Sequence, residues 1–226
     1  VQGPFTPADN EEHEELWTPI IEGDEIVIEV SLPIKNRHEL QLHLKSVNHD
    51  FMGFKSMSGL LSGSCNLDVV CGEENGWGIV DQYRDIIQSV ANMSINGTEF
   101  CTGFLVNNVR QDCRPFFMTA NHCDNLNENS APSLVVYWNY VNSFCREPGS
   151  SSSGNNGNGS FNDFNSGSIF RSAFGPSDVK LVELDDEVSG TADVFFAGWD
   201  ARELLPTDTL ICVHHPSNQE KRISFQ

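Results

Sequence analysis

A histidine at the end of an apolar run is the residue with the clearest chemical potential in this sequence. The segment FFMTANHC (116–123) begins with apolar residues, continues with small ones and presents His122 beside Cys123. A strand that is fixed by its buried face holds an imidazole with little positional freedom, which general-base catalysis requires. We take His122 as the candidate general base. The alternative is a structural histidine whose ring bonds to backbone carbonyls.

An aspartate at the start of a second apolar run is the candidate partner of this histidine. The run PSDVKLVEL (176–184) sets Asp178 at the entry to a predicted buried strand. A carboxylate in that place can accept the histidine Nδ1–H bond, fix the tautomer of the ring and stabilise the imidazolium. The alternative interpretation of Asp178 is a turn residue that precedes a strand.

The cysteines indicate disulfide chemistry. Cys101 lies upstream in FCTGFLVNN (100–108) and could pair with Cys123, which would brace the turn that carries His122. The chain has seven cysteines and none of them forms a CxxC pair, so disulfides in an oxidising compartment fit better than a structural zinc site. We therefore expect a secreted, extracellular protein.

The charge balance excludes several classes of partner. Asp and Glu total 32 against 13 Lys and Arg, which gives a formal net charge of -19. Such a charge repels nucleic acid and anionic lipid and favours cationic partners. No run reaches the ~18 apolar residues of a membrane span. We predict no nucleic-acid partner and no membrane insertion.

Metal and cofactor binding are not expected. His214 and His215 are adjacent on a predicted strand, so their side chains point to opposite faces, and we interpret them as a surface pair. The acidic runs NEEHEE (10–15) and VELDDEV (182–188) lack the spacing and glycine of an EF-hand loop. We predict no metal site and no cofactor.

Alternation at period two predicts strands in the N-terminal part of the chain. The runs EIVIEVSLP (25–33) and ELQLHLKSV (39–47) alternate apolar and polar residues, which is typical of half-buried strands. We assign residues 1–58 to a small β-rich segment. The glycine- and serine-rich GLLSGSC (59–65) predicts a flexible junction and a domain boundary.

The rest of the chain predicts an all-β barrel. Its short apolar runs are rich in Val, Ile, Phe and Tyr and are separated by turn residues. The polar GSSSSGNNGNGS (149–160) predicts a flexible surface loop between two strands. The predicted strands cover residues 85–93, 100–108, 115–120, 134–140, 179–184, 194–199 and 210–216.

A long series of ordered motifs resembles one family. The sequence is similar to the trypsin-like serine peptidases of the bacterial lysyl endopeptidase group, and the N-terminal WTPIIEGDEIVIEV (17–30) with VNHDFMGF (47–54) resembles the propeptide region of that group. The motifs are SGSCNLDVVC (62–71), YRDIIQSV (83–90), CTGFLVNN (101–108), FFMTANHC (116–123), LVVYWNY (134–140), SDVKLVEL (177–184), FAGWDAR (196–202) and HHPSNQEKRIS (214–224).

This resemblance implies a chymotrypsin-type double β-barrel. The expected parts are a propeptide-like segment at 1–58, a complete first barrel at 59–190 and the start of a second barrel at 191–226. His122 and Asp178 match the base and orienter positions of the family. The cysteine pattern of the family implies the pairs Cys71–Cys145 and Cys101–Cys123, places the partner of Cys65 in an absent C-terminal part, and leaves Cys113 and Cys212 without an assigned counterpart.

The catalytic serine is the element of the family pattern that the chain lacks. A chymotrypsin-like order places it after the aspartate, in a GxSGxP-like turn. Ser189, Ser217 and Ser224 follow Asp178, and none has this setting. We therefore expect a fragment, inactive by itself, of a serine endopeptidase that cleaves polypeptides after lysine, whose partner is its own missing C-terminal barrel. The alternative is a secreted pseudoprotease or binding module on the same barrel.

Overall fold

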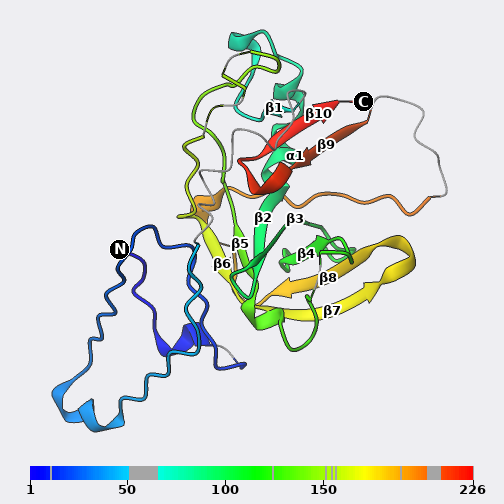
Figure 1. Cartoon of the computed structure of the whole chain (residues 1–226). Helices are drawn as coiled ribbons and strands as arrows, with labels where there is room; N and C mark the ends of the chain where they lie inside the picture. The colour runs from blue at the N-terminus through cyan, green and yellow to red at the C-terminus, as the bar shows by residue number, and fades with distance from the viewer. Residues whose placement is uncertain are drawn as a thin grey trace.

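Seven antiparallel strands form the larger of two sheets in the computed structural model of the chain. The structure describes residues 1–10, 12–50, 66–123, 125–150, 152–153, 155, 157–188, 190–202 and 210–225. The strands are β2 (Val90–Ile95), β3 (Glu99–Leu105), β4 (Phe116–Thr119), β5 (Val135–Tyr137), β6 (Phe164–Ser166), β7 (Ser168–Phe174) and β8 (Val179–Leu184). Their order in the sheet is β6-β5-β2-β3-β4-β8-β7, and the sheet curls around one core (Figure 1).

A second, three-stranded sheet joins segments from both ends of the region 66–225. Its strands are β1 (Leu67–Asp68), β9 (Ile211–His214) and β10 (Arg222–Phe225), in the order β1-β10-β9. Leu67 pairs with Ile223, so the predicted first-barrel and second-barrel regions share this sheet. The strand-dominated architecture confirms the predicted all-β, trypsin-like fold class.

Helices are short and few in the described part of the chain. The α-helix there is α1 (Arg84–Ser89), and no described helix has the length and apolar character needed to cross a membrane. The 3-10 helices are η1 (Pro7–Asn10), η2 (Ile34–Glu39), η4 (Glu73–Asn75), η5 (Val80–Tyr83), η6 (Ala131–Ser133), η7 (Gly175–Ser177), η8 (Gly190–Ala192) and η9 (Pro216–Asn218).

The main core lies inside the curl of the larger sheet. Phe117 on β4 is fully buried and meets Trp138 edge to face, with ring centroids 6.0 Å apart. On the neighbouring strand, a Cβ at Gly103 would lie 2.2 Å from the Phe117 ring, so only glycine allows this approach. The close packing fixes β4, whose C-terminal end leads into the turn of His122.

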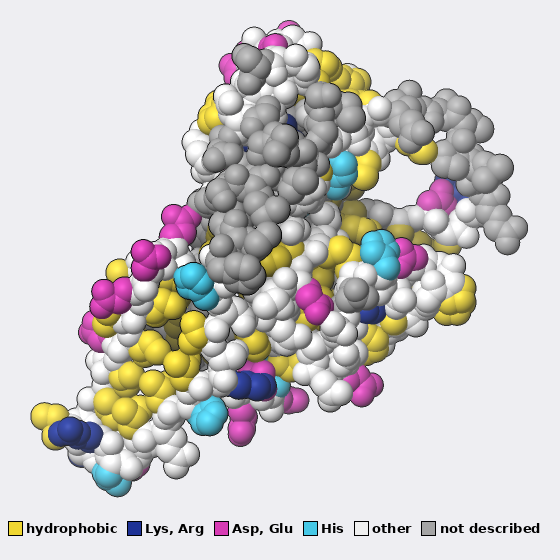
Figure 2. Space-filling model, in the orientation of Figure 1, with side chains coloured by type: hydrophobic (Ala, Val, Ile, Leu, Met, Phe, Trp, Pro, Cys, Tyr) yellow, Lys and Arg dark blue, Asp and Glu magenta, His cyan; other side chains and the backbone are white. Residues whose placement is uncertain are grey.

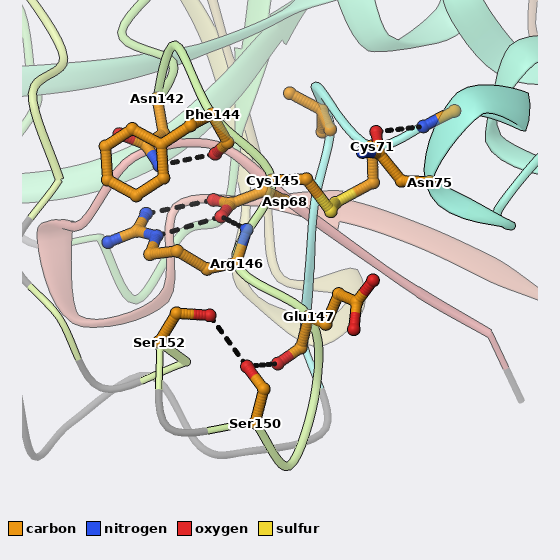
Figure 3. Close-up of a disulfide and its surroundings, with 12 residues drawn as sticks. Asp68, Cys71, Asn75, Asn142, Phe144, Cys145, Arg146, Glu147, Ser150 and Ser152 are labelled. Atoms are coloured by element: carbon orange, nitrogen blue, oxygen red, sulfur yellow. Dashed lines mark hydrogen bonds and ion pairs between the residues drawn. A yellow bond between two sulfur atoms is a disulfide. The ribbon is translucent and has the colours of Figure 1, made fainter.

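A buried network of charges holds the second sheet to the rest of the barrel. Arg146 is fully buried and donates two side-chain hydrogen bonds, 2.8 and 2.9 Å long, to the carboxylate of Asp68 on β1 (Figure 3). Glu220 Oε2 lies 3.0 Å from Arg146 Nη2, and Arg222 Nε lies 3.1 Å from Asp68 Oδ1. These four charges compensate one another, as buried ions must.

The two strands predicted in the N-terminal segment are wrong. The described residues of 25–33 and 39–47 form no strand, and η2 occupies Ile34–Glu39 between them. Figure 1 shows this segment projecting from the barrel, and Figure 2 shows hydrophobic side chains gathered on it. The physical reason is that alternation supplies a strand face but no hydrogen-bonded neighbour, and isolated strands are unstable in water.

Two predicted strands in the barrel region also differ from the structure. Residues 85–93 divide into α1 and β2, because a short apolar run does not distinguish a helix from a strand by its periodicity. Residues 194–199 form no strand; they contribute one isolated parallel bridge between Ala197 and Val106. The junction predicted at 59–65 lies outside the described residues.

Candidate active site

Strand pairing brings the two candidate residues to the same end of the larger sheet. β4 and β8 are antiparallel neighbours, and Thr119 at the end of β4 pairs with Lys180 near the start of β8. His122 follows β4 by three residues, and Asp178 directly precedes β8. The C-terminal end of one strand and the N-terminal end of the other therefore position the pair.

The histidine and the aspartate form a close hydrogen-bonded dyad. His122 Nδ1 lies 2.6 Å from Asp178 Oδ2, and the backbone N–H of His122 donates to Asp178 Oδ1 over 2.8 Å. Because an ionised carboxylate only accepts, the ring donates through Nδ1–H. This tautomer leaves the Nε2 lone pair as the basic position. The His122 side chain is 75% exposed, so the ring is open to a reactant.

The backbone at Asp178 turns its carboxylate toward the histidine. Asp178 has φ 53° and ψ 47°, a left-handed conformation that Asp tolerates better than most residues. It ends η7, and its N–H donates to Gly175 O over 3.0 Å. The hydrogen bond from the His122 side chain, helped by the His122 backbone amide, lowers the pKa of Asp178 below its ordinary value. The carboxylate is thus kept ionised.

A disulfide braces the turn that carries the histidine. Cys101 on β3 is bonded to Cys123, the residue after His122, with their Cα atoms 5.9 Å apart. The second disulfide, Cys71–Cys145, has Cα atoms 4.9 Å apart. These are the two pairs that the family resemblance implies. Cys113 and Cys212 are free and exposed thiols, and Cys65 lies outside the described residues.

The remaining sequence candidates lie elsewhere in the fold. Ser217 is in η9 and Ser224 is in β10 of the other sheet, whereas Ser189 lies outside the described residues. The interpretation of His214 and His215 as a surface pair is wrong for His215, which is 5% exposed and donates from Nδ1 to Gln219 O over 2.8 Å. No cluster in the described ranges has three His, Cys, Asp or Glu residues placed to hold a metal ion.

Sequence reasoning missed two features that position the dyad. The first is the second hydrogen bond to Asp178 from the His122 backbone, and the second is the left-handed turn after η7. A signal for the turn was present, because Gly175 and Pro176 precede the aspartate and both favour turns.

One open hollow on the surface includes neither dyad residue. It is lined by Val70, Gly72, Glu73, Glu74, Asp81 and Arg84.

Most of the chain matches one known protein family. Residues 61–226 match the family model of the lysyl endopeptidase C-terminal domain. Over 219 residues the chain is 29% identical to a lysyl endopeptidase of Pseudomonas aeruginosa, an alignment that covers 92% of this chain and 45% of that protein. The chain thus spans less than half of the length of this relative. With most of its residues matched by the family model, the chain belongs to the lysyl endopeptidase C-terminal domain family.

Proposed function

We propose that this chain is the N-terminal part of a secreted serine endopeptidase in which His122 is the general base and acid and Asp178 orients it. The observation that carries the proposal is the 2.6 Å contact between His122 Nδ1 and Asp178 Oδ2 at one end of the barrel sheet. A Ser-His-Asp triad consists of a nucleophile, a base and a residue that orients the base. The His122–Asp178 pair supplies the last two of these.

The chemistry of this dyad is proton transfer during acyl transfer. A serine Oγ attacks the scissile carbonyl carbon while His122 Nε2 takes the hydroxyl proton, and the imidazolium then gives that proton to the leaving amine. Water attacks the acyl-enzyme in the same way, with His122 again taking and returning a proton. Asp178 holds the ring in the Nδ1–H tautomer and stabilises the imidazolium.

The nucleophile of the proposed enzyme lies in sequence beyond residue 226. No GxSGxP-like turn follows Asp178 in this chain, and the chain covers 45% of its Pseudomonas aeruginosa relative. The name of that relative supports cleavage after lysine, and the net charge of -19 is suited to attracting cationic polypeptides. Two disulfides support an extracellular location.

A serine-directed phosphonate that carries a lysine-like side chain tests the proposal. We expect it to leave the 226-residue chain unlabelled and to label the product of the complete reading frame at one serine. In that product His122→Ala should slow labelling by at least about 10³-fold, because the hydroxyl loses its base. His43→Ala, which changes an exposed histidine of the N-terminal segment, is the matched control and should label normally.

Three outcomes would contradict the proposal. Stoichiometric labelling of the 226-residue chain would require a reactive serine within it. A reading frame that stops at Gln226 would favour a non-catalytic binding module on the same barrel. Wild-type labelling of the His122→Ala product would show that His122 is not the base of the reactive serine.

A further inference from the structure

One stretch of the N-terminal segment, residues 13–20, is packed against the barrel. Pro19 is buried, and His13, Trp17 and Ile20 are partly buried. The following residues, 21–50, are exposed at almost every position. Apart from a hydrogen bond of 2.6 Å from Asn48 Nδ2 to Asn96 O, the contact of the N-terminal segment with the barrel is therefore concentrated in this short peptide.

The polar part of this contact is a hydrogen bond between His13 and Asp185. His13 Nε2 lies 2.9 Å from Asp185 Oδ2, and the Asp185 side chain is only 5% exposed. The backbone N–H of Glu15 donates to His13 Nδ1 over 3.2 Å, so Nδ1 accepts and Nε2–H donates to the carboxylate. Loss of His13 would leave a buried carboxylate without this donor, which is costly.

The apolar part of the contact covers one edge of the larger sheet. Trp17 and Ile20 pack against a buried cluster formed by Val135, Tyr137, Tyr140 and Phe161. Ser166 Oγ on β6 donates to the backbone carbonyl of Trp17 over 2.6 Å. A tryptophan that packs on buried aromatic residues is typical of an energetically dominant contact in protein interfaces.

This contact lies away from the catalytic dyad. Asp185 follows the C-terminal end of β8, whereas Asp178 precedes its N-terminal end. A six-residue strand separates the two sites by about 20 Å, at ~3.4 Å per residue. The His122 ring stays 75% exposed with the N-terminal segment in place, so the segment does not close the dyad.

We propose that residues 13–20 are a docking peptide that binds the β5–β6 edge and Asp185 without needing the covalent connection, so that the N-terminal segment remains on the barrel after the chain is cut between residues 51 and 65. The partner of this surface is thus a segment of the same chain, held by an aromatic contact and a His–Asp hydrogen bond. The role of the docked segment is to cover an apolar edge of the barrel and not to block His122.

A cut chain tests this proposal directly. A recognition sequence for a specific protease, inserted after Ser58 in the full 226-residue chain, allows one cut after folding. We expect the two pieces to elute together in size-exclusion chromatography at about 10 μM, with a dissociation constant in the low micromolar range or tighter. Trp17→Ala should weaken the complex by about tenfold or more, and Asp185→Asn should weaken it by a smaller factor.

The controls separate docking from general stickiness and from misfolding. Leu42→Ala removes an apolar side chain that is 64% exposed on the same segment, and it should not change the dissociation constant. In the uncut Trp17→Ala chain, hydrogen-exchange rates should rise at residues 135–137 and 164–166, where the docked peptide is lost. The rates at β4 and β8 should stay unchanged, which would show that the barrel is folded. Separation of the pieces of the cut wild-type chain, or equal weakening by Leu42→Ala, would overturn the proposal.

Discussion

The N-terminal segment and the barrel carry the same kind of sequence pattern and have opposite structures. EIVIEV (25–30) and VKLVEL (179–184) are both short, mostly apolar runs with two charged residues each. The second is β8, hydrogen-bonded to β4 on one side and β7 on the other, with Val182 fully buried. In the first, Val27 is 81% exposed and no strand forms. A short apolar run thus has the capacity to be a strand, and neighbours on both edges decide whether it is one.

The largest expected difference between the two regions concerns their ion pairs. Asp68→Ala leaves the buried Arg146 guanidinium without its bidentate partner and should lower the free energy of unfolding by about 3–5 kcal/mol. Lys45→Ala removes an ion pair with Glu15 in which the lysine side chain is 64% exposed, and it should cost at most about 1 kcal/mol. Urea denaturation of both variants measures the difference. Equal effects would mean that the buried network contributes no more than a surface pair.

Truncation of an apolar side chain should also destabilise the protein much more in the barrel than in the N-terminal segment. Phe117→Ala opens a cavity in the fully buried core and should destabilise the barrel by about 3–5 kcal/mol. Leu44→Ala, at a side chain 63% exposed, should change stability by less than about 0.5 kcal/mol. Thermal unfolding followed by near-ultraviolet circular dichroism reports on the barrel aromatics. A loss at Leu44 comparable with that at Phe117 would show that the segment has a core of its own.

The Cys71–Cys145 disulfide should stabilise the barrel and leave the docked segment unaffected. It closes a sequence separation of 74 residues, so the double variant Cys71→Ala/Cys145→Ala should lose about 2–4 kcal/mol. In this variant the hydrogen-exchange rates at residues 13–20 and at β6 should change by the same factor. An unchanged unfolding midpoint would contradict the stabilising role assigned to this bridge.

The smallest expected effect is a shift in the titration of Asp178. The His122 hydrogen bond lowers the pKa of this carboxyl in the folded protein, so His122→Ala should raise it toward the ordinary value of 3.8. A depressed folded pKa stabilises the native state above the unfolded pKa, and this stabilisation is lost as the pH falls through the folded pKa. Carboxyl carbon-13 NMR follows the titration. Asp112, whose pKa is lowered mainly by Asn108, is the internal control and should not move.

The sequence predicted the all-β class and the two residues that the structure joins in a dyad. These signals are local, since an apolar run followed by His122 and an aspartate before a second apolar run are visible within eight or nine residues. The Cys71–Cys145 pair followed only from the family resemblance, because its partners are 74 residues apart and no local pattern joins them.

The remaining features depend on contacts between distant parts of the chain. The pairing of β1 with β10 and the burial of Arg146 against Asp68 each join residues far apart in sequence, and neither leaves a periodic trace. Residues 25–33 form no strand for the same reason. Whether a neighbouring strand is present depends on distant residues, and the run itself carries no information about it. His13 has no local feature that identifies Asp185 as its partner.

Nitrogen-15 NMR of the His122 ring tests the central claim, that His122 is a base oriented by Asp178, most directly. At neutral pH the account predicts the Nδ1–H tautomer, with Nδ1 as the protonated nitrogen, Nε2 carrying the lone pair and a scalar or relaxation signature of the bond to Asp178. In Asp178→Asn this preference should be lost or reversed, whereas Asp200→Asn, at an exposed carboxylate paired with Arg202, should leave it unchanged. A predominant Nε2–H tautomer in the wild-type chain would contradict the claim.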